Sequence, residues 1–262
     1  MPRDEVPGIE FSGNDLQKLY SEISALPLQT KLPEFPGKQG APLTPIPIYS
    51  ENMTGDLTRP FILRNFSGLS IDRKFFEAAI AAEPEIYGYD SSPRDNSEVE
   101  ALTLPGAEVL ARFKKRQLNF NIVDSECSQP QSLLTKWHSS KLKYPPSISW
   151  IVTLAPALTY FHVDPPYGDA FMFLCGGRKV WLLIAPEDLA HGEARHGFAT
   201  VNNLPLKELL LLDDGFLWGR LHIGAIGAGD LIYFPQDWAH YVRTLEDSFG
   251  YGGYFGGVEE QV

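Results

Sequence analysis

ALTYFHVD, at residues 157–164, is the stretch that decides both the fold and the chemistry of this chain. It is one of several short apolar or alternating runs that favour β-strands over helices. His162 and Asp164 lie two residues apart, so on a strand their side chains emerge on the same face. The spacing therefore predicts a pair of metal ligands, and an HxD tripeptide needs a third ligand from elsewhere.

His240 is the candidate for this third ligand, 78 residues after His162. It lies in GDLIYFPQDWAHYV, where a Gly-Asp turn starts a strand and Pro235 marks its end. Two imidazoles and one carboxylate leave about three open positions on an octahedral iron(II), enough for a chelating cosubstrate and dioxygen. Zinc-dependent hydrolysis could use the same residues, but it would require an added general base.

The runs around these ligands predict a mainly β fold with decorating helices. Seven strand-like runs punctuated by Gly, Pro and Asp favour a closed or sandwiched antiparallel sheet. They are SISWIVTL, ALTYFHVD, AFMFLC, KVWLLIA, DLIYFP, AHYVRTL and SFGYGGYF. PFILRNF (60–66) predicts one more strand, and helices are expected over 14–26, 72–83, 106–115, 128–140 and 203–212, with a shorter candidate at PEDLAHG.

A chain of 262 residues with 44% hydrophobic content is long enough for one sizeable core. We expect residues 1–59 to form an N-terminal helix and a Pro-rich arm that packs on the barrel. Residues 60–262 are expected to form the catalytic domain as a single globular unit.

Composition excludes several other classes of protein. A formal charge of −11 disfavours direct nucleic-acid binding, which needs clustered Lys and Arg. The acidic surface would suit a cationic partner, although solubility explains it equally well. No run approaches the roughly 20 apolar residues of a membrane span, and the polar, acidic start MPRDEVPGIE lacks the basic flank and apolar stretch of a signal peptide. We therefore expect an intracellular protein, cytoplasmic and/or nuclear, in which Cys127 and Cys175 are reduced.

Four stretches in order, TYFHVD, GGRKVWLLIAP, GDLIYFPQDWAHYV and DSFGYGGYF, resemble the core of a JmjC oxygenase over residues 117–256. The resemblance implies a double-stranded β-helix, also called a cupin or jelly-roll barrel. It further implies that His162, Asp164 and His240 bind Fe(II), and that 2-oxoglutarate is the cosubstrate.

The same resemblance implies which residues bind the cosubstrate. Lys179 would pair with the distal carboxylate of 2-oxoglutarate. Thr159 would donate a hydrogen bond to that carboxylate, but an ideal strand puts positions 159 and 162 on opposite faces, so a bulge between them is required. Tyr254 stands where the family typically has Asn, and Met172 where it has Tyr, so both affect the expected contacts with the cosubstrate.

Other side chains are expected to surround this site. Lys179, Trp181 and Leu183 share one strand face, which favours burial of the lysine. The aromatic lining is expected from Tyr160, Phe161, Phe171, Phe173 and Tyr233. Asp169, in the PPYGD loop, could meet a cationic substrate or be a solvated turn residue. His138, His191, His196 and His222 have no partner at ligand spacing and are left outside the site.

The stretches LNFNIVDSECS and SWIVTLAPALTYFHVD most resemble JmjC enzymes that remove methyl groups from histone lysines, notably those associated with a PHD finger. The resemblance implies a dioxygenase that hydroxylates a C–H bond of a protein or peptide, either as an N-methyl-lysine demethylase or as a side-chain hydroxylase. Two alternatives stay open: a small-molecule hydroxylase of secondary metabolism, and a catalytically silent barrel that serves as a binding module.

Overall fold

The computed structural model describes residues 44–50, 56–66, 73–90, 101–117, 120–121, 147–155, 157–164, 166, 168–190 and 220–255. The helices expected over 14–26, 128–140 and 203–212 lie outside these residues, as do Cys127, His138, His191 and His196. Most of residues 1–59 also lie outside them. The exception within the Pro-rich arm is its end, which contributes two short strands to the sheet.

Strands dominate the described part of the chain, as the sequence predicts. In chain order they are β1 (Thr44–Pro45), β2 (Ile48–Ser50), β3 (Phe61–Arg64), β4 (Ile86–Asp90), β5 (Ala101–Leu104), β6 (Phe120–Asn121), β7 (Ser147–Thr153), β8 (Leu158–His162), β9 (Asp169–Ile184), β10 (His222–Gly227), β11 (Leu231–Phe234) and β12 (Ala239–Phe255). Two helices, α2 (Arg73–Ala82) and α3 (Gly106–Lys114), confirm the predictions over 72–83 and 106–115.

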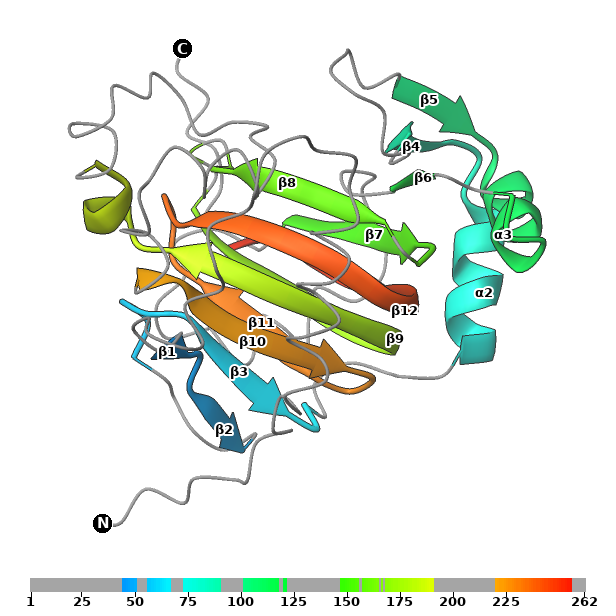
Figure 1. Ribbon diagram of the computed structural model, residues 1–262. Coiled ribbons are helices and arrows are strands. Elements are labelled where there is room, and N and C mark those ends of the chain that lie inside the picture. The colour runs from blue at the N-terminus through cyan, green and yellow to red at the C-terminus, as the bar shows by residue number, and fades with distance from the viewer. Residues whose placement is uncertain are drawn as a thin grey trace, which may run out of the picture.

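The two longest strands, β9 and β12, run antiparallel side by side through the middle of the sheet (Figure 1). On the outer side of β9, its first half pairs with β11 and its second half with β10. On the outer side of β12, its first half pairs with β8 and its second half with β7. β3 and β2 extend the sheet beyond β11, and β1 extends it beyond β10. The sheet therefore curls into a half-barrel, which confirms the predicted jelly-roll fold class.

Both long strands are irregular near their middle, and this irregularity changes which residues face the interior. One buried cluster of apolar side chains lies on the inner face of the curled sheet, and we call it the interior cluster. Before Gly176 its members from β9 are the even-numbered Met172 and Leu174, whereas after Gly176 they are the odd-numbered Trp181 and Leu183. The pairing with β12 shifts register between Thr244 and Gly250, opposite this point. A bulge inserts a residue and so reverses the alternation of faces along a strand.

This bulge corrects the sequence prediction of separate strands. AFMFLC and KVWLLIA form the single strand β9, and AHYVRTL and SFGYGGYF form the single strand β12. The Gly-Gly pair at 176–177 signals a turn in the sequence, but it provides the positive φ that a bulge requires. Five described strands, β1, β2, β4, β5 and β10, were not predicted. β1, β2 and β5 span only two to four residues, and glycines interrupt the patterns of β4 and β10.

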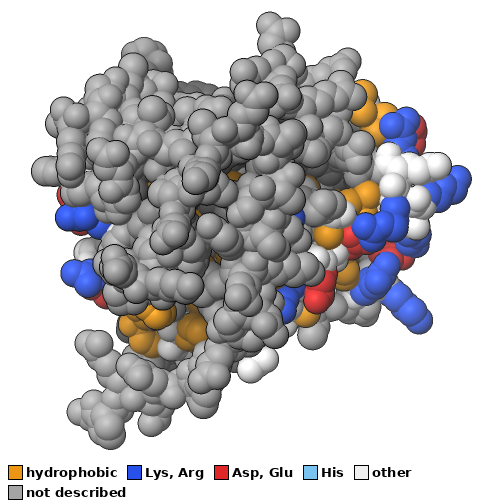
Figure 2. Space-filling view, in the orientation of Figure 1, with side chains coloured by type: hydrophobic (Ala, Val, Ile, Leu, Met, Phe, Trp, Pro, Cys, Tyr) orange, Lys and Arg blue, Asp and Glu red, His pale blue; other side chains and the backbone are white. Residues whose placement is uncertain are grey.

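A second buried cluster covers the other face of the sheet, where α2 and α3 pack. Phe76 of α2 contacts the rings of Trp150, Phe249 and Tyr251, with centroids 5.1–5.5 Å apart. Phe75, the preceding residue of α2, is 44% exposed. Charged side chains gather over these helices (Figure 2), and several pair with each other, including Lys114 with Glu77 at 2.6 Å. In the described chain no helix has the length and apolar character needed to cross a bilayer.

The bulge gives a direct test of this architecture. Gly177 has φ of 84°, and a Cβ there would lie 2.4 Å from the backbone oxygen of Asp247. Gly177→Ala should therefore lower the free energy of unfolding by about 2 kcal/mol or more, measured by chemical denaturation. Gly227→Ala is the matched control, because a Cβ there meets nothing closer than 3.7 Å. Equal effects of the two substitutions would contradict the bulge.

Candidate metal centre

His162, Asp164 and His240 lie together at one end of the β8–β12 ladder. His162 ends β8 and is the direct cross-strand partner of His240, and Asp164 follows two residues later. Asp164 Oδ1 is 3.3 Å from Nε2 of His162 and 3.8 Å from Nε2 of His240. One ligand atom from each residue can be chosen so that all lie within 4.8 Å of one another. Within the described ranges, no other group of His, Cys, Asp or Glu side chains comes together in this way.

The bulge predicted between Thr159 and His162 is present. His162 pairs with His240 and Thr159 with Val242, so three steps along β8 correspond to two steps along β12. Cross-strand partners share a face of the sheet. The hydroxyl of Thr159 and the imidazole of His162 are therefore on the same face, which a regular strand would not allow.

His240 is held in an orientation suited to metal binding. Its side chain is buried, and Nδ1 lies 3.3 Å from the backbone oxygen of Trp238. When Nδ1 carries the proton and donates it to that oxygen, Nε2 remains a free lone pair directed at Asp164. Burial, and then the charge of a protonated His162, lower the pKa of His240 to about 4, so its imidazole is neutral at physiological pH.

Asp164 supplies the negative charge of the site. Burial alone would raise the pKa of Asp164, but the positive charge that His240 carries when protonated, and hydrogen bonds donated by His162 and Tyr254, hold this pKa below its ordinary value. The carboxylate is therefore ionised at neutral pH. Tyr254, expected among the cosubstrate contacts, is thus placed by the structure beside a candidate metal ligand.

Two imidazoles and one carboxylate fit a divalent metal ion. This donor set suits the two-histidine, one-carboxylate sites of iron(II) oxygenases, and zinc accepts the same ligands. The residues present therefore fit the metal that the sequence implies.

Lys179 lies on the same face of β9 as Trp181, whose ring contacts His240 at 5.7 Å. Lys179 is only 3% exposed, and its Nζ donates a hydrogen bond to Thr153 Oγ1 at 2.9 Å. Burial lowers the pKa of Lys179 to about 7. No carboxylate forms an ion pair with Lys179 in the part of the chain that the structure describes. Burying an ammonium without a paired carboxylate is costly, and an anion bound beside Lys179 would lower that cost.

The expected aromatic lining is wrong for three residues. Phe171, Phe173 and Tyr233 belong to the outer cluster under α2 and α3. The rings that flank His240 are those of Phe234, at 4.8 Å, and Trp181. The cause is the bulge in β9, because the alternation that places Lys179 inward cannot be extended back to Phe171.

Phe161 is a fourth residue of the expected aromatic lining that lies elsewhere. Phe161 packs against Tyr241, the neighbour of His240 that points to the opposite face. The side chain of Tyr160 lies outside what the structure describes. Phe234 was missed, although its position just before Pro235, in the stretch that carries His240, was a signal in the sequence.

Asp169 is not a solvated turn residue. Its Oδ2 accepts a hydrogen bond from the hydroxyl of Tyr233 at 2.5 Å, and its Oδ1 accepts one from the backbone N–H of Gln236 at 3.0 Å. The carboxylate therefore connects the start of β9 to the turn that leads into His240. The positive φ of Asp237 lies in the same turn.

Comparison with known proteins identifies distant relatives. No family model matches the chain. Over 147 residues it is 25% identical to JmjC domain-containing histone demethylation protein 1 of Caenorhabditis elegans, which covers 55% of this chain and 12% of the relative. Over 109 residues it is 32% identical to HSPB1-associated protein 1 of Rattus norvegicus, which covers 38% of this chain and 22% of the relative. The chain thus spans less than a quarter of the length of these curated relatives, and the predicted resemblance to JmjC proteins is confirmed at this low identity and partial coverage.

The metal centre can be tested without any substrate. We expect His162→Ala, Asp164→Ala and His240→Ala each to weaken Mn²⁺ binding by at least about 100-fold, since loss of an outer partner alone costs roughly 10- to 100-fold. Isothermal titration calorimetry on the metal-free protein measures this. His222→Ala is the control, because His222 is the remaining described histidine and lies outside the group. Unchanged Mn²⁺ affinity in the three variants would show that these residues do not form a metal centre.

Burial of Lys179 makes a separate prediction about stability. Its folded pKa of about 7 lies below the ordinary 10.5, so between these values the unfolded chain binds more protons. Stability of the metal-free protein should therefore rise as pH increases through this window. Lys179→Met should flatten the rise and stabilise the protein at pH 6 by on the order of 2–5 kcal/mol. Denaturant titrations from pH 6 to 10 measure both effects, and parallel pH profiles would contradict the burial.

Proposed function

We propose that this chain is an Fe(II)- and 2-oxoglutarate-dependent oxygenase of the JmjC type, which hydroxylates a C–H bond of its substrate. The observation that carries the proposal is the His162–Asp164–His240 group together with the buried ammonium of Lys179 on the same side of the barrel. The JmjC relatives support it independently. Zinc hydrolysis would use the same three ligands, but it gives no reason for a buried cation nearby.

Each residue has a role that follows from its surroundings. His162, Asp164 and His240 would hold iron(II), and Lys179 would bind the distal carboxylate of 2-oxoglutarate. When bound, iron and 2-oxoglutarate would allow dioxygen to act as the oxidant: one oxygen atom would enter the C–OH product, and the other would enter succinate as 2-oxoglutarate is oxidised and loses carbon dioxide.

The protein itself orients the metal ligands and shields them from water. The carbonyl of Trp238 holds His240 in one orientation, and the hydroxyl of Tyr254 holds Asp164. Trp181 and Phe234 cover His240 with apolar rings, so water has little access from that side. A dry, fixed site limits side reactions of a strong oxidant.

A protein substrate is the class that the relatives favour. The C. elegans and Caenorhabditis briggsae proteins are named for histone demethylation. The formal charge of −11 on this chain also suits a basic peptide. We therefore propose N-methyl-lysine demethylation or side-chain hydroxylation of a protein, met in the nucleus or cytoplasm.

The decisive experiment measures coupled turnover. Protein loaded with Fe(II) and supplied with 2-oxoglutarate and a library of methylated and unmethylated basic peptides should form succinate, detected by mass spectrometry. Formaldehyde release would identify demethylation, and a peptide mass gain of one oxygen would identify stable hydroxylation.

His162→Ala should abolish succinate formation, whereas His222→Ala should retain it. If succinate formed only with small molecules, the proposal of a protein substrate would be wrong and a small-molecule hydroxylase would take its place. If the protein bound Mn²⁺ normally but turned over no substrate, the oxygenase proposal would be wrong and a binding module would be the better interpretation.

A further inference from the structure

Lys179 contacts a hydroxyl that the sequence did not single out. Thr153, the last residue of β7, is fully buried, and its Oγ1 accepts the hydrogen bond from Lys179 Nζ at 2.9 Å. Both residues pair with β12, Thr153 with Ser248 and Lys179 with Thr244. They thus meet at the bulge where β9 and β12 change faces.

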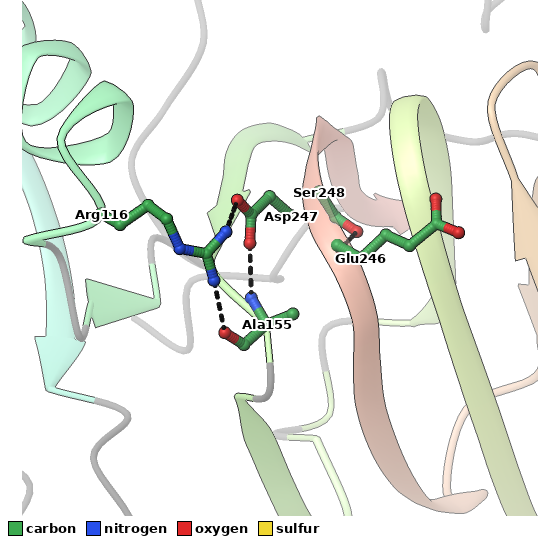
Figure 3. A network of polar contacts seen from close by, with 5 residues as sticks. All are labelled: Arg116, Ala155, Glu246, Asp247 and Ser248. Atoms are coloured by element: carbon green, nitrogen blue, oxygen red, sulfur yellow. Dashed lines mark hydrogen bonds and ion pairs between the residues drawn. The ribbon is translucent and has the colours of Figure 1, made fainter.

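A polar network next to Thr153 fixes its position (Figure 3). The backbone N–H of Ala155 donates to Asp247 Oδ1 at 3.0 Å, and the backbone oxygen of Ala155 accepts from Arg116 at 3.2 Å. Arg116 also forms an ion pair with Asp247. The end of β7 is therefore tied to the bulge of β12 and to the segment after α3.

Ser248 offers another hydroxyl near Thr153, but it has a different hydrogen-bond partner. The hydroxyl of Ser248, the cross-strand partner of Thr153, donates to the backbone oxygen of Glu246 at 2.6 Å. It is thus engaged within the bulge itself. Thr153 is the hydroxyl that contacts the ammonium, whereas Thr159 pairs with Val242 further along the ladder.

The chemistry of a hydroxyl beside an ammonium suits a carboxylate. An ammonium has three donors and the threonine oxygen accepts one of them, which leaves two for an anion. The threonine can in turn donate its own O–H to the same anion. Lys179 and Thr153 can therefore both donate hydrogen bonds to one carboxylate. The threonine donor is neutral and is held in a fixed place.

We propose that Thr153 is a positioning residue for the anion site: it holds Lys179 Nζ and hydrogen-bonds the distal carboxylate of the cosubstrate, the role that the family resemblance implies for Thr159. This proposal rests on the proposed function, because it takes the anion to be a dicarboxylate that also reaches the metal.

The test compares two keto acids on Mn²⁺-loaded protein, which binds without turnover. 2-Oxoglutarate has the distal carboxylate, and 2-oxovalerate has the same keto acid end without it. Thr153→Val should raise the Kd for 2-oxoglutarate about 10-fold, as expected for loss of a hydrogen bond to a charged group. The Kd values for 2-oxovalerate and Mn²⁺ should change less than about 2-fold, and Thr153→Ser should restore most of the affinity.

Two further variants complete the comparison. Thr159→Val tests the rival hydroxyl, and Thr103→Val, at an exposed position of β5, is the neutral control. The proposal is overturned if Thr153→Val binds 2-oxoglutarate as well as the parent does, if it weakens both keto acids equally, or if Thr159→Val alone shows the dicarboxylate effect.

Failure of the proposed function has a different signature. In that case the parent protein would bind Mn²⁺ but show no preference for 2-oxoglutarate over 2-oxovalerate. The Lys179–Thr153 contact is then read by NMR titration of the lysine ε-methylene, where Thr153→Val should lower the pKa of Lys179 further because the ammonium loses its acceptor. An unchanged titration would show that the contact itself is absent.

Discussion

The pairing of β9 with β12 is the constraint on which the rest of the structure depends. These strands contact each other along nearly their whole length, and every other strand of the large sheet joins them directly or through a neighbour. Their bulge reverses the two faces midway, so the first half of β9 sends Phe171 and Phe173 to the helices and the second half sends Lys179 and Trp181 to the interior. Without that reversal, Lys179 would lie under the helical layer, away from His240.

The site concentrates groups that are costly to bury. An ammonium, a carboxylate and two imidazoles share one side of a barrel whose neighbouring side chains are mostly apolar. Desolvation disfavours the charged forms of Asp164 and Lys179. Local contacts, that of Tyr254 among them, outweigh it for Asp164, whereas the hydrogen bond to Thr153 leaves the pKa of Lys179 lowered. Such an arrangement is expected where a bound cation and a bound anion complete the charges, which is why we interpret it as a site and not as core.

Local sequence features predicted the parts of the fold that depend on local order. The HxD spacing, the Gly-Asp turn before β11 and the helices with periodic apolar residues are all read within one element, and the structure confirms their positions. The bulge at Thr159 was also predictable, because only a bulge reconciles two functional side chains with one face. The Gly-Gly bulge was not, since a Gly pair in a sequence signals a turn as readily as a strand irregularity. Thr153 was missed for a related reason: its contact with Lys179 depends on pairing across β12, which no local pattern encodes.

The candidate ligands come from two strands that are far apart in the chain, His162 at the end of β8 and His240 near the start of β12. The ladder that joins them closes a long intervening stretch that contains β9 to β11, so the site is a product of non-local contacts of the kind that form slowly. A metal ion that needs all three side chains would bind the native chain and not its partly folded forms. By mass action, metal availability would then add directly to the free energy that keeps this barrel closed.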